Sequence, residues 1–375
     1  MNPADSRLLV ADPDLPALRP VLDPEVLCAL VGYPAVVSRI RYKPGTSIVA
    51  KLSHDAGGAD DWIAGYAPHA LAKLEKLGDG ARVLQLPDGP GYAAVGPLRA
   101  DRALHRPLRR LESDWQLVRY NPNRRAVLRV ESRFGQLAVK VTRPSQQADA
   151  AVTSHLSASH DWVLPPVAGY AGADHGVTAT SWWGKANLAD LPETKTAETA
   201  GRALAAIHGG AAPDWLPLRQ PSRLSHRLHN QLKAIKHILP DSLGAATASL
   251  GRISGRISEL PQSTGLVHGD FSADQVLVDD AEVRFVDFDR AMAGPQLMDL
   301  GSFAAAAILD DQEFLTAGLL EGYAAGGGGT SFRMDDLAAW TAFGVALRLL
   351  EPFRDRESGW DEQLRHRLDL IDGLL

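Results

Sequence analysis

The sequence is nearly free of cysteine, because Cys28 is the only one in 375 residues. A single thiol can form neither an internal disulfide nor a metal site built from several thiolates. The amino terminus lacks a basic segment followed by an apolar core, and no apolar run approaches the roughly 18 residues that a bilayer crossing requires. We therefore expect a cytoplasmic protein that is neither secreted nor inserted into a membrane.

The chain also lacks a large excess of charge of either sign. The chain has 39 basic and 45 acidic residues and a net charge of −6, so no uniform field would draw its whole surface to nucleic acid or anionic lipid. The slight acidic excess favours a cationic or neutral ligand. Hydrophobic (45%) and charged (22%) contents are near globular averages. At about 150 residues per domain, the length predicts two or three domains.

Two segments of the first half resemble each other. Residues 38–52 and 117–141 each place an Arg-Tyr-x-Pro turn between runs rich in β-branched residues. The first segment predicts a hairpin around residues 43–46, and the second predicts three strands divided at residues 121–124 and 133–136. Two related β units would give two small sheets; the alternative is that a Tyr-x-Pro turn recurs by chance.

From residue 145 onward the pattern becomes helical. Ala197, Ala200, Leu204 and Ile207 follow a 3-4-3 spacing, and Gly209 is placed to end that helix. Similar patterns continue to the carboxy terminus, with one β-like interruption.

That interruption, GLVHGDFSADQVLVDDAEVRFVDFDRA at residues 265–291, carries an unusual set of polar side chains. A hairpin between residues 276 and 286 would return Asp287 beside Gln275, because antiparallel strands of similar length bring their ends together. Transfer of a phosphoryl group needs a carboxylate near the attacking hydroxyl and hard oxygen ligands for Mg²⁺. The pattern offers Asp270 for the first role and Gln275 with Asp287 for the second.

These residues resemble a known family, the aminoglycoside phosphotransferases and choline kinases, which are relatives of the protein kinases. HGDFSADQ and VDFD resemble its His-Gly-Asp-x-x-x-x-Asn and Asp-Phe-Asp/Glu motifs, and LAAIH and DLGSF resemble further signatures. The resemblance implies Asp270 as the catalytic aspartate, with His268 bracing its loop. It also implies Gln275 and Asp287 as magnesium ligands, and Lys140 of LAVKV as the lysine that contacts the phosphates of ATP.

The resemblance further implies an α+β, protein-kinase-like bilobal fold, with a small β-rich N-lobe, a mostly helical C-lobe and an additional N-terminal α/β cap. TATSWWGKANL resembles the hinge between lobes, which places Trp182 and Trp183 beside the nucleotide. We expect the cap at residues 1–105, the N-lobe and hinge at 106–185, and the C-lobe with the catalytic loop at 186–375.

The chain departs from the family pattern at three places. Gln275 replaces the usual asparagine, as in the maltokinase and glucosamine kinase branch, which tilts the acceptor toward sugars. NPNRR replaces the Gly-rich turn, so either Arg124 or Arg125 contacts phosphate or the turn is solvated. Asp149 is the nearest candidate for the acidic partner of Lys140, with a solvated helix residue as the alternative.

Two neighbouring residues have open roles. His268 suits a structural role better than that of a general base, because Asp270 already occupies the latter. Asp289 either touches magnesium or only pairs with Arg290.

The residues together predict an ATP-dependent small-molecule kinase, a phosphotransferase whose acceptor is an alcohol group on a sugar, aminosugar or aminoglycoside-like molecule. A protein kinase is disfavoured because Gly269 stands where arginine is usual and only twelve residues separate Asp287 from Asp299. The alternative from another class is a catalytically silent, nucleotide-binding pseudokinase that acts as a binding or regulatory module. We expect no nucleic acid or membrane partner.

Acidic groups near the carboxy terminus offer one hypothesis for the acceptor pocket. DDQE at residues 310–313 and DRESGWDE at 355–362, with Trp340 and Trp360, would line a site for a polyhydroxylated or amino-bearing ring. The alternative is that these are solvated helix faces with tryptophans packed in the core.

Overall fold

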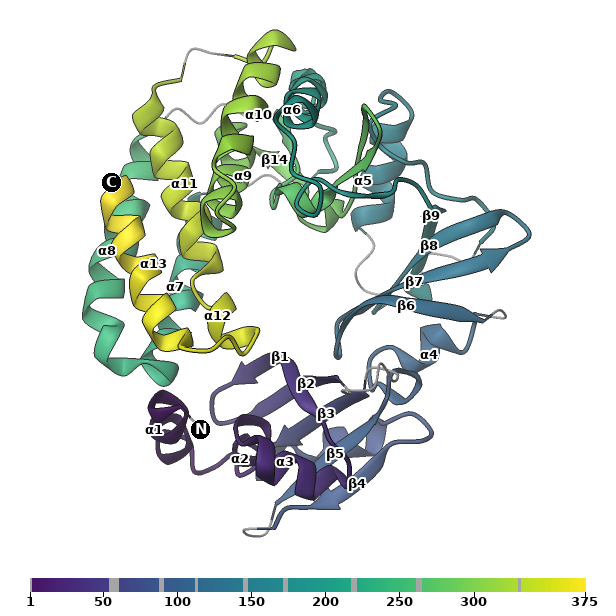
Figure 1. Ribbon diagram of the computed structural model, residues 1–375, viewed down its shortest axis with the longest axis vertical. Coiled ribbons are helices and arrows are strands. Elements are labelled where there is room, and N and C mark those ends of the chain that lie inside the picture. Colours follow the sequence, from purple (N-terminus) through teal and green to yellow (C-terminus); the bar gives the residue numbers. More distant parts are fainter. Residues whose placement is uncertain are drawn as a thin grey trace.

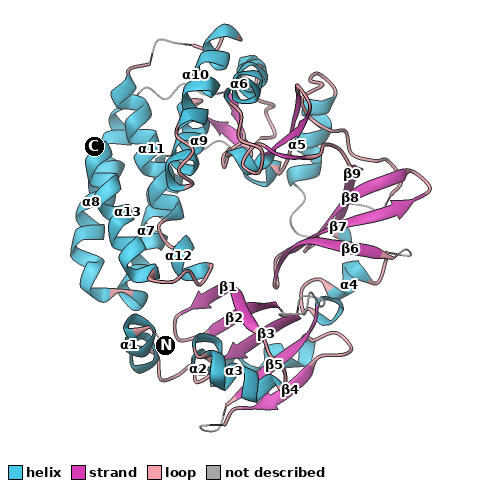
Figure 2. Ribbon diagram, in the orientation of Figure 1, coloured by secondary structure: helices cyan, strands magenta, loops and turns pink. Residues whose placement is uncertain are grey.

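Two larger antiparallel sheets, two small sheets and a large group of helices make up the described part of the chain (Figure 1). The computed structural model describes residues 2–53, 61–87, 91–111, 114–143, 148–170, 175–216, 221–260, 265–329 and 332–375. One sheet lies near the amino terminus, the second follows it, and the carboxy-terminal half is mainly helical (Figure 2). The α+β class expected from the sequence is confirmed.

The amino-terminal sheet, called the cap sheet here, has the strand order β1-β2-β3-β5-β4. Its strands are β1 (Val36–Lys43), β2 (Ser47–Ser53), β3 (Asp61–Tyr66), β4 (Arg82–Gln85) and β5 (Tyr92–Pro97). The accompanying helices are α1 (Pro3–Ala11), α2 (Leu18–Leu22), α3 (Pro24–Val31), η1 (Pro68–Lys76), η2 (Leu98–Ala100) and α4 (His105–Leu108). The hairpin predicted around residues 43–46 is confirmed by the pairing of β1 with β2.

Side chains alternate across the cap sheet, so its two faces pack against different neighbours. Ile48, Ala50 and Leu52 belong to a core that also contains residues of α1–α3 and of the carboxy-terminal helices. Val49 and Trp62 belong to the core shared with the second sheet. The cap sheet is therefore held from both sides.

The second sheet contains β6 (Trp115–Asn121), β7 (Arg125–Ser132), β8 (Gly135–Thr142) and β9 (Val177–Ser181), paired antiparallel in that order. Its first three strands confirm the predicted divisions at residues 121–124 and 133–136. Helix α5 (Ala148–Ser157) follows β8 and packs against the 3-10 turn η6 (Phe288–Arg290).

The two β segments that resemble each other in sequence share a hydrogen-bonded turn. In the first hairpin, Asp12 accepts a hydrogen bond from the Tyr42 hydroxyl at 2.6 Å and another from the N–H three residues later at 2.8 Å. In the second, Asp101 accepts from the Tyr120 hydroxyl at 2.8 Å and from the N–H three residues later at 2.6 Å. The residue that donates this N–H has a positive φ in both hairpins, 60° and 59°. This shared arrangement favours a repeat over a chance similarity.

The carboxy-terminal part is a group of helices with two small sheets. Its helices are α6 (Thr194–Gly209), α7 (Pro221–Ile238), η4 (Pro240–Ser242), α8 (Leu243–Glu259), η5 (Ala273–Gln275), α9 (Leu297–Leu309), α10 (Phe314–Ala325), α11 (Met334–Arg348), α12 (Glu351–Arg354) and α13 (Trp360–Leu374). Its strands are β10 (Ala186–Asn187), β11 (Gly265–Val267), β12 (Val276–Asp279), β13 (Glu282–Phe285) and β14 (Met292–Gly294). Strands β10, β12 and β13 form one sheet, and β11 pairs with β14. No helix in the described ranges combines the length and the apolar character that a bilayer crossing requires.

Helix α6 confirms the predicted helix, with Gly209 as its last residue. Gly201 allows the backbones of α6 and α10 to touch, since a Cβ at this position would lie 2.1 Å from the carbonyl oxygen of Leu319. This close approach fixes the end of α6 that carries His208.

Candidate active site

One buried carboxylate holds the loop that follows β11. Asp299, on α9 and fully buried, accepts hydrogen bonds from the backbone N–H of His268 at 2.6 Å and of Gly269 at 2.8 Å. Gly269 has a φ of 82°, and a Cβ there would lie 2.2 Å from the carbonyl oxygen of Arg290. Only glycine fits this turn without displacing backbone. The next residue, Asp270, keeps 28% of its side chain exposed.

Helix α6 in turn positions Asp299. His208 Nε2 lies 3.1 Å from Asp299 Oδ2, and His208 Nδ1 lies 3.0 Å from the Tyr323 hydroxyl. Burial raises the pKa of Tyr323 to about 12, so the hydroxyl stays protonated at neutral pH. The LAAIH and DLGSF segments thus meet in space around the loop.

The ring of His268 lies in the core. Its Nε2 is 2.9 Å from the carbonyl oxygen of Val286, and the ring packs against Phe271 and Phe288. Only 1% of the residue is exposed. This position suits a residue that braces the loop against the strand leading to Asp287.

The Asp270 carboxylate faces a guanidinium group. Arg290 Nη1 lies 2.8 Å from Asp270 Oδ2. Burial acts to raise the pKa of Asp270, but the charges of Arg290, Arg348 and Arg227 outweigh it and hold the pKa below the usual range of aspartate. Asp270 is therefore ionised at neutral pH and can accept a proton or a hydrogen bond. Asp289 forms ion pairs with Lys140 at 2.8 Å and with Arg125 at 3.3 Å.

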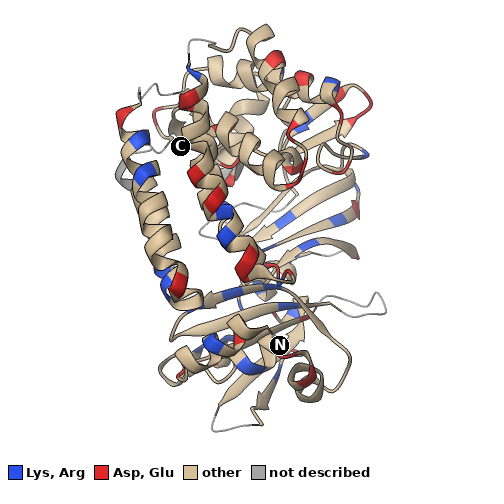
Figure 3. Cartoon of the chain, turned by 60° about the vertical axis from the view of Figure 1, so that its left-hand side comes forward, with Lys and Arg blue, Asp and Glu red and all other residues tan. Residues whose placement is uncertain are grey.

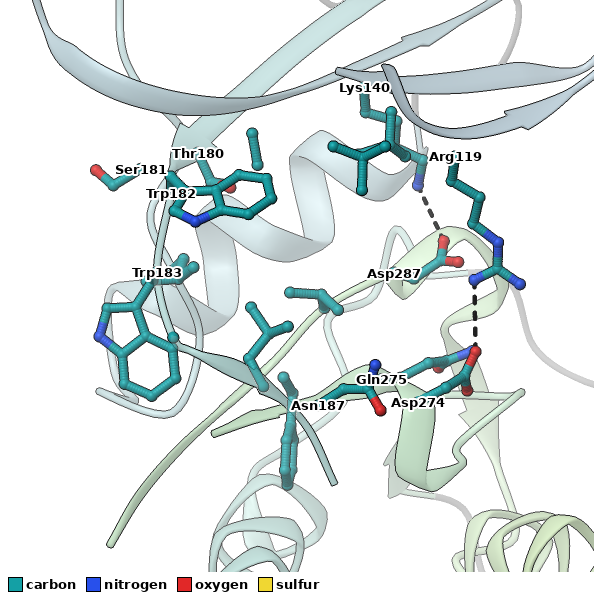
Figure 4. A pocket seen from close by; sticks show the side chains of 18 of the residues that line it. Arg119, Lys140, Thr180, Ser181, Trp182, Trp183, Asn187, Asp274, Gln275 and Asp287 are labelled. Carbon is teal, nitrogen blue, oxygen red and sulfur yellow. Dashed lines mark hydrogen bonds and ion pairs between the residues drawn. The ribbon is translucent and has the colours of Figure 1, made fainter. Parts of the chain in front are cut away.

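The hairpin of β12 and β13 brings the next two candidates together, as predicted. Val276 pairs with Phe285, and the N–H of Val286 donates to the carbonyl oxygen of Gln275 at 3.1 Å. Asp287 follows directly with a φ of 69°. The side chains of Gln275 and Asp287 line the same cavity (Figure 4).

The side chain of Gln275 offers an unused acceptor. Its Oε1 is buried and has no hydrogen-bond partner among the described residues. An unsatisfied buried polar atom costs about 1–3 kcal/mol, so a ligand at this point would stabilise the site. An amide oxygen beside a carboxylate is a donor set that Mg²⁺ accepts. Gln275 and Asp287 therefore fit a magnesium ion.

Two cations engage Asp287. Lys140 Nζ lies 3.0 Å from Asp287 Oδ1 and 2.8 Å from Asp289 Oδ1. Arg125 Nη1 lies 2.7 Å from Asp287 Oδ2 and 3.3 Å from Asp289 Oδ2. Burial acts to raise the pKa of Asp287, but Lys140 and Arg125 hold it far below the usual range. Both aspartates are thus acidic partners of Lys140, whereas the side chain of Asp149 lies outside the described residues.

The two arginines of the turn that replaces the Gly-rich loop differ in position. Arg125 reaches into the site, and only 26% of its side chain is exposed. The alternative of a fully solvated turn is therefore wrong for Arg125. Arg124 is exposed.

These side chains belong to a cavity of about 360 Å³ between the second sheet and the helical part. Apolar residues from both sides contribute to its walls: Val127, Ala138, Leu164, Leu277 and Phe285. Trp182 and Trp183, directly after β9, line it as well; the guanidinium of Arg129 lies 4.8 Å from the Trp182 ring and that of Arg284 lies 4.8 Å from the Trp183 ring. Apolar walls with charged groups at one end suit a flat ring that carries phosphates.

The structure thus collects most of the predicted residues at one place. The cavity is lined by Lys140, Trp182, Trp183, Gln275 and Asp287. Asp270 and His268 lie in the adjoining loop and do not line it. The hypothesis of a pocket built on Trp340 and Trp360 is wrong, because both are 1% exposed and pack in the core.

Three residues of this site were not assigned from the sequence. Asp299 and His208 lie in segments that resemble family signatures, yet no local pattern connects a histidine with an aspartate 91 residues later. The sequence offers Arg290 only as a partner of Asp289, whereas in the structure the guanidinium of Arg290, in the η6 turn, forms an ion pair with Asp270.

Comparison with known proteins places this geometry in context. A family model described as "Phosphotransferase enzyme family" matches residues 114–340, which is more than half of the chain. No curated protein matches significantly.

Several solved structures are similar at low sequence identity. A choline/ethanolamine kinase family protein from Mesorhizobium loti has a TM-score of 0.52 at 16% identity, covering 69% of this chain and 87% of that one. A putative fructosamine-3-kinase from Thermobifida fusca has a TM-score of 0.51 at 17% identity, covering 72% and 97%. The amicoumacin kinase hAmiN, in complex with AMP-PNP, Ca²⁺ and Ami, has a TM-score of 0.54 at 13% identity, covering 69% and 88%. These likenesses confirm the predicted protein-kinase-like fold.

Proposed function

The chain belongs to the phosphotransferase enzyme family, and from that premise we propose that it transfers the γ-phosphate of ATP to a hydroxyl group of a small polyhydroxylated molecule. One observation supports the site most directly. The unpartnered Oε1 of Gln275 and the carboxylate of Asp287 line one cavity with Lys140, and Asp270 lies in the adjoining loop.

The proposed nucleotide site uses residues from both sides of the cavity. Trp182, Trp183 and the apolar walls take the adenine ring, and Lys140 contacts the phosphates. Gln275 and Asp287 would hold Mg²⁺, which neutralises charge on the phosphates when bound. The similar amicoumacin kinase is solved with AMP-PNP and Ca²⁺, which supports a nucleotide and a divalent cation in a fold of this kind.

Asp270 is the proposed catalytic base. Its lowered pKa keeps it ionised. The proton of the acceptor hydroxyl passes to the Asp270 carboxylate as the new O–P bond forms, and the bond between the γ-phosphorus and the bridging oxygen breaks to release ADP. Asp299 keeps the loop in place through its bonds to two backbone N–H groups.

The acceptor class is a proposal as well. Gln275 in the motif favours a sugar, and an aminosugar or aminoglycoside-like molecule belongs to the same expectation. ATP as donor fits the reducing cytoplasm that the single cysteine favours.

A silent nucleotide-binding module is the second candidate. Cations pair with both Asp270 and Asp287, and the Gly-rich turn is replaced; these features favour nucleotide binding without transfer as the alternative function of the site.

The test separates these functions. ATP binding is titrated with Mg²⁺, and ADP release is measured with a panel of sugars, aminosugars and aminoglycosides. We expect acceptor-dependent ADP release, with Asp270→Asn binding ATP normally but transferring about 10²–10⁴-fold more slowly. Binding without acceptor-dependent release across the panel would favour the silent module.

A further inference from the structure

Four arginines from four elements form a group in which three lie within electrostatic reach of the fourth, Arg124, and one of the three forms an ion pair with Asp270. They are Arg41 on β1, Arg124 in the β6–β7 turn, Arg290 in η6 and Arg354 at the end of α12. We call them the arginine cluster. In Figure 3, basic residues recur along the strands of both sheets.

Two of the four elements are in direct contact. Helix α12 packs against β1, and an ion pair of 2.5 Å between Arg39 and Asp355 joins the two elements next to Arg41 and Arg354. Arg290 extends the cluster to the catalytic loop.

The cluster has few counter-charges. Within the described ranges, the three members other than Arg290 have no carboxylate at salt-bridge distance. Two carboxylates, Glu351 in α12 and Asp355 just after it, act on Arg354, but each is shared with another arginine: Asp355 with Arg39, and Glu351 with Arg367 at 3.7 Å. Arg290 pairs with Asp270, the carboxylate that the proposed reaction requires.

Arg124 shows the electrostatic consequence. The residue is exposed, yet enough protein surrounds its guanidinium that burial lowers its pKa, and the charges of Arg41, Arg290, Arg125 and Arg354 lower it further. The positive charges of these arginines repel one another, and a bound anion would offset that repulsion.

We propose that the arginine cluster binds an anionic group of the acceptor, so that the substrate is a polyhydroxylated molecule carrying a phosphate or a carboxylate. The inference rests on the proposed kinase function and narrows its substrate class. Guanidinium groups bind both anions through paired, charge-assisted hydrogen bonds.

The nucleotide phosphates are a poorer match for the cluster. Arg125 and Lys140 line the nucleotide cavity, whereas no member of the cluster is among its lining residues. A cationic acceptor of the aminoglycoside kind is also disfavoured, because the charges beside Asp270 would repel it. The proposal thus reverses the expectation of a cationic or neutral ligand drawn from overall composition.

A binding experiment tests the cluster directly. Inorganic phosphate is titrated calorimetrically into the full chain with AMP-PNP and Mg²⁺ at saturation, so that the nucleotide site is filled. We expect saturable binding that Arg354→Gln weakens by at least about tenfold, the effect of losing one charge-assisted bond. Arg252→Gln is the matched control, since Arg252 lies on α8, pairs with Asp372 and is 51% exposed.

A second variant distinguishes loss of phosphate binding from a folding defect of the first variant. Arg41→Gln changes a different element of the cluster and should weaken phosphate binding in the same direction. Absent phosphate binding in the wild type, or unchanged binding in both cluster variants, overturns the proposal. Failure of AMP-PNP to bind would instead refute the proposed kinase function.

Turnover distinguishes the two anions. ADP release is compared for glucose, glucosamine, glucose 6-phosphate and glucuronate. Preference for the phosphate or for the carboxylate identifies the group, and Arg354→Gln should reduce that preference about tenfold while leaving the KM for ATP unchanged. Higher kcat/KM for glucose or glucosamine than for both anions refutes the inference.

Discussion

Replacing Asp299 with asparagine should disable the catalytic loop without touching a ligand. Asp299 Oδ1 accepts from the N–H of Gly269, and Oδ2 accepts from the N–H of His268 and faces His208. Asparagine keeps one acceptor oxygen and adds an NH₂ group. Whichever way the amide is turned, its NH₂ meets a backbone N–H of the loop, so a donor faces a donor.

The size of the expected loss of stability follows from the burial of Asp299. Asp299 is fully buried, so the N–H that loses its acceptor has no access to water as a replacement. The loss of a charge-assisted bond and the unsatisfied N–H together predict a decrease of about 2–4 kcal/mol in the free energy of unfolding. A shift of the loop by about 1 Å should lower kcat by roughly 10²-fold.

The measurement combines urea unfolding with kinetics. The KM for ATP should stay near the wild-type value, because Gln275 and Asp287 are held by a separate hairpin. Asp335→Asn is the control: Asp335 pairs with Arg333 at 2.6 Å and is 67% exposed, so the loss of its charge should cost under about 1 kcal/mol and leave kcat unchanged. If Asp299→Asn matched this control in both stability and kcat, the positioning role of Asp299 would be refuted.

Three further predictions concern the cavity. Gln275→Asn should raise the magnesium requirement and Gln275→Leu should nearly abolish activity, whereas magnesium titrations that superimpose for all three proteins would show that Gln275 is no ligand. Lys140→Ala should weaken ATP binding by removing a fixed charge from the phosphates; unchanged ATP titrations and rates would place that role elsewhere. The pKa of Asp287 is depressed in the folded state, so its ion pairs stabilise the protein above the unfolded pKa of about 3.9 and are lost as the pH falls below it. The stability difference between wild type and Asp287→Asn should therefore shrink below about pH 4, and a difference that stays constant with pH would contradict this assignment.

The hairpin that joins Gln275 and Asp287 was predictable because it is local. Two short apolar runs and a turn between them are enough to set its pairing, and Val276 indeed pairs with Phe285. The same holds for the hairpin at residues 43–46 and for helix α6. In each case, the residues that determine the structure lie within about one element of one another in the sequence.

The contacts that hold the catalytic loop were not predictable in this way. His208 and Asp299 meet because α6 and α9 both pack against α10 and share one core, and their contact spans 91 residues. The arginine cluster is a still longer-range feature, since β1 and α12 lie near opposite ends of the chain. Net charge also misleads here, because a total of −6 does not reveal a local excess of arginine.

The ion pairs around Asp287 all neutralise charges that are largely buried. Asp287 is 21% exposed and Lys140 is 16% exposed, so neither charge is fully solvated and each needs a partner. Removing one partner of such a pair costs more than exchanging it for another of the same sign. Under the proposed function, Asp287 would hold the metal ion, and Lys140 and Arg125 would have the nucleotide phosphates as new partners. An anionic acceptor would do the same for Arg290 on its release from Asp270. Loading of the site would thus replace one counter-ion with another, and no buried charge would be left alone before Asp270 receives its proton.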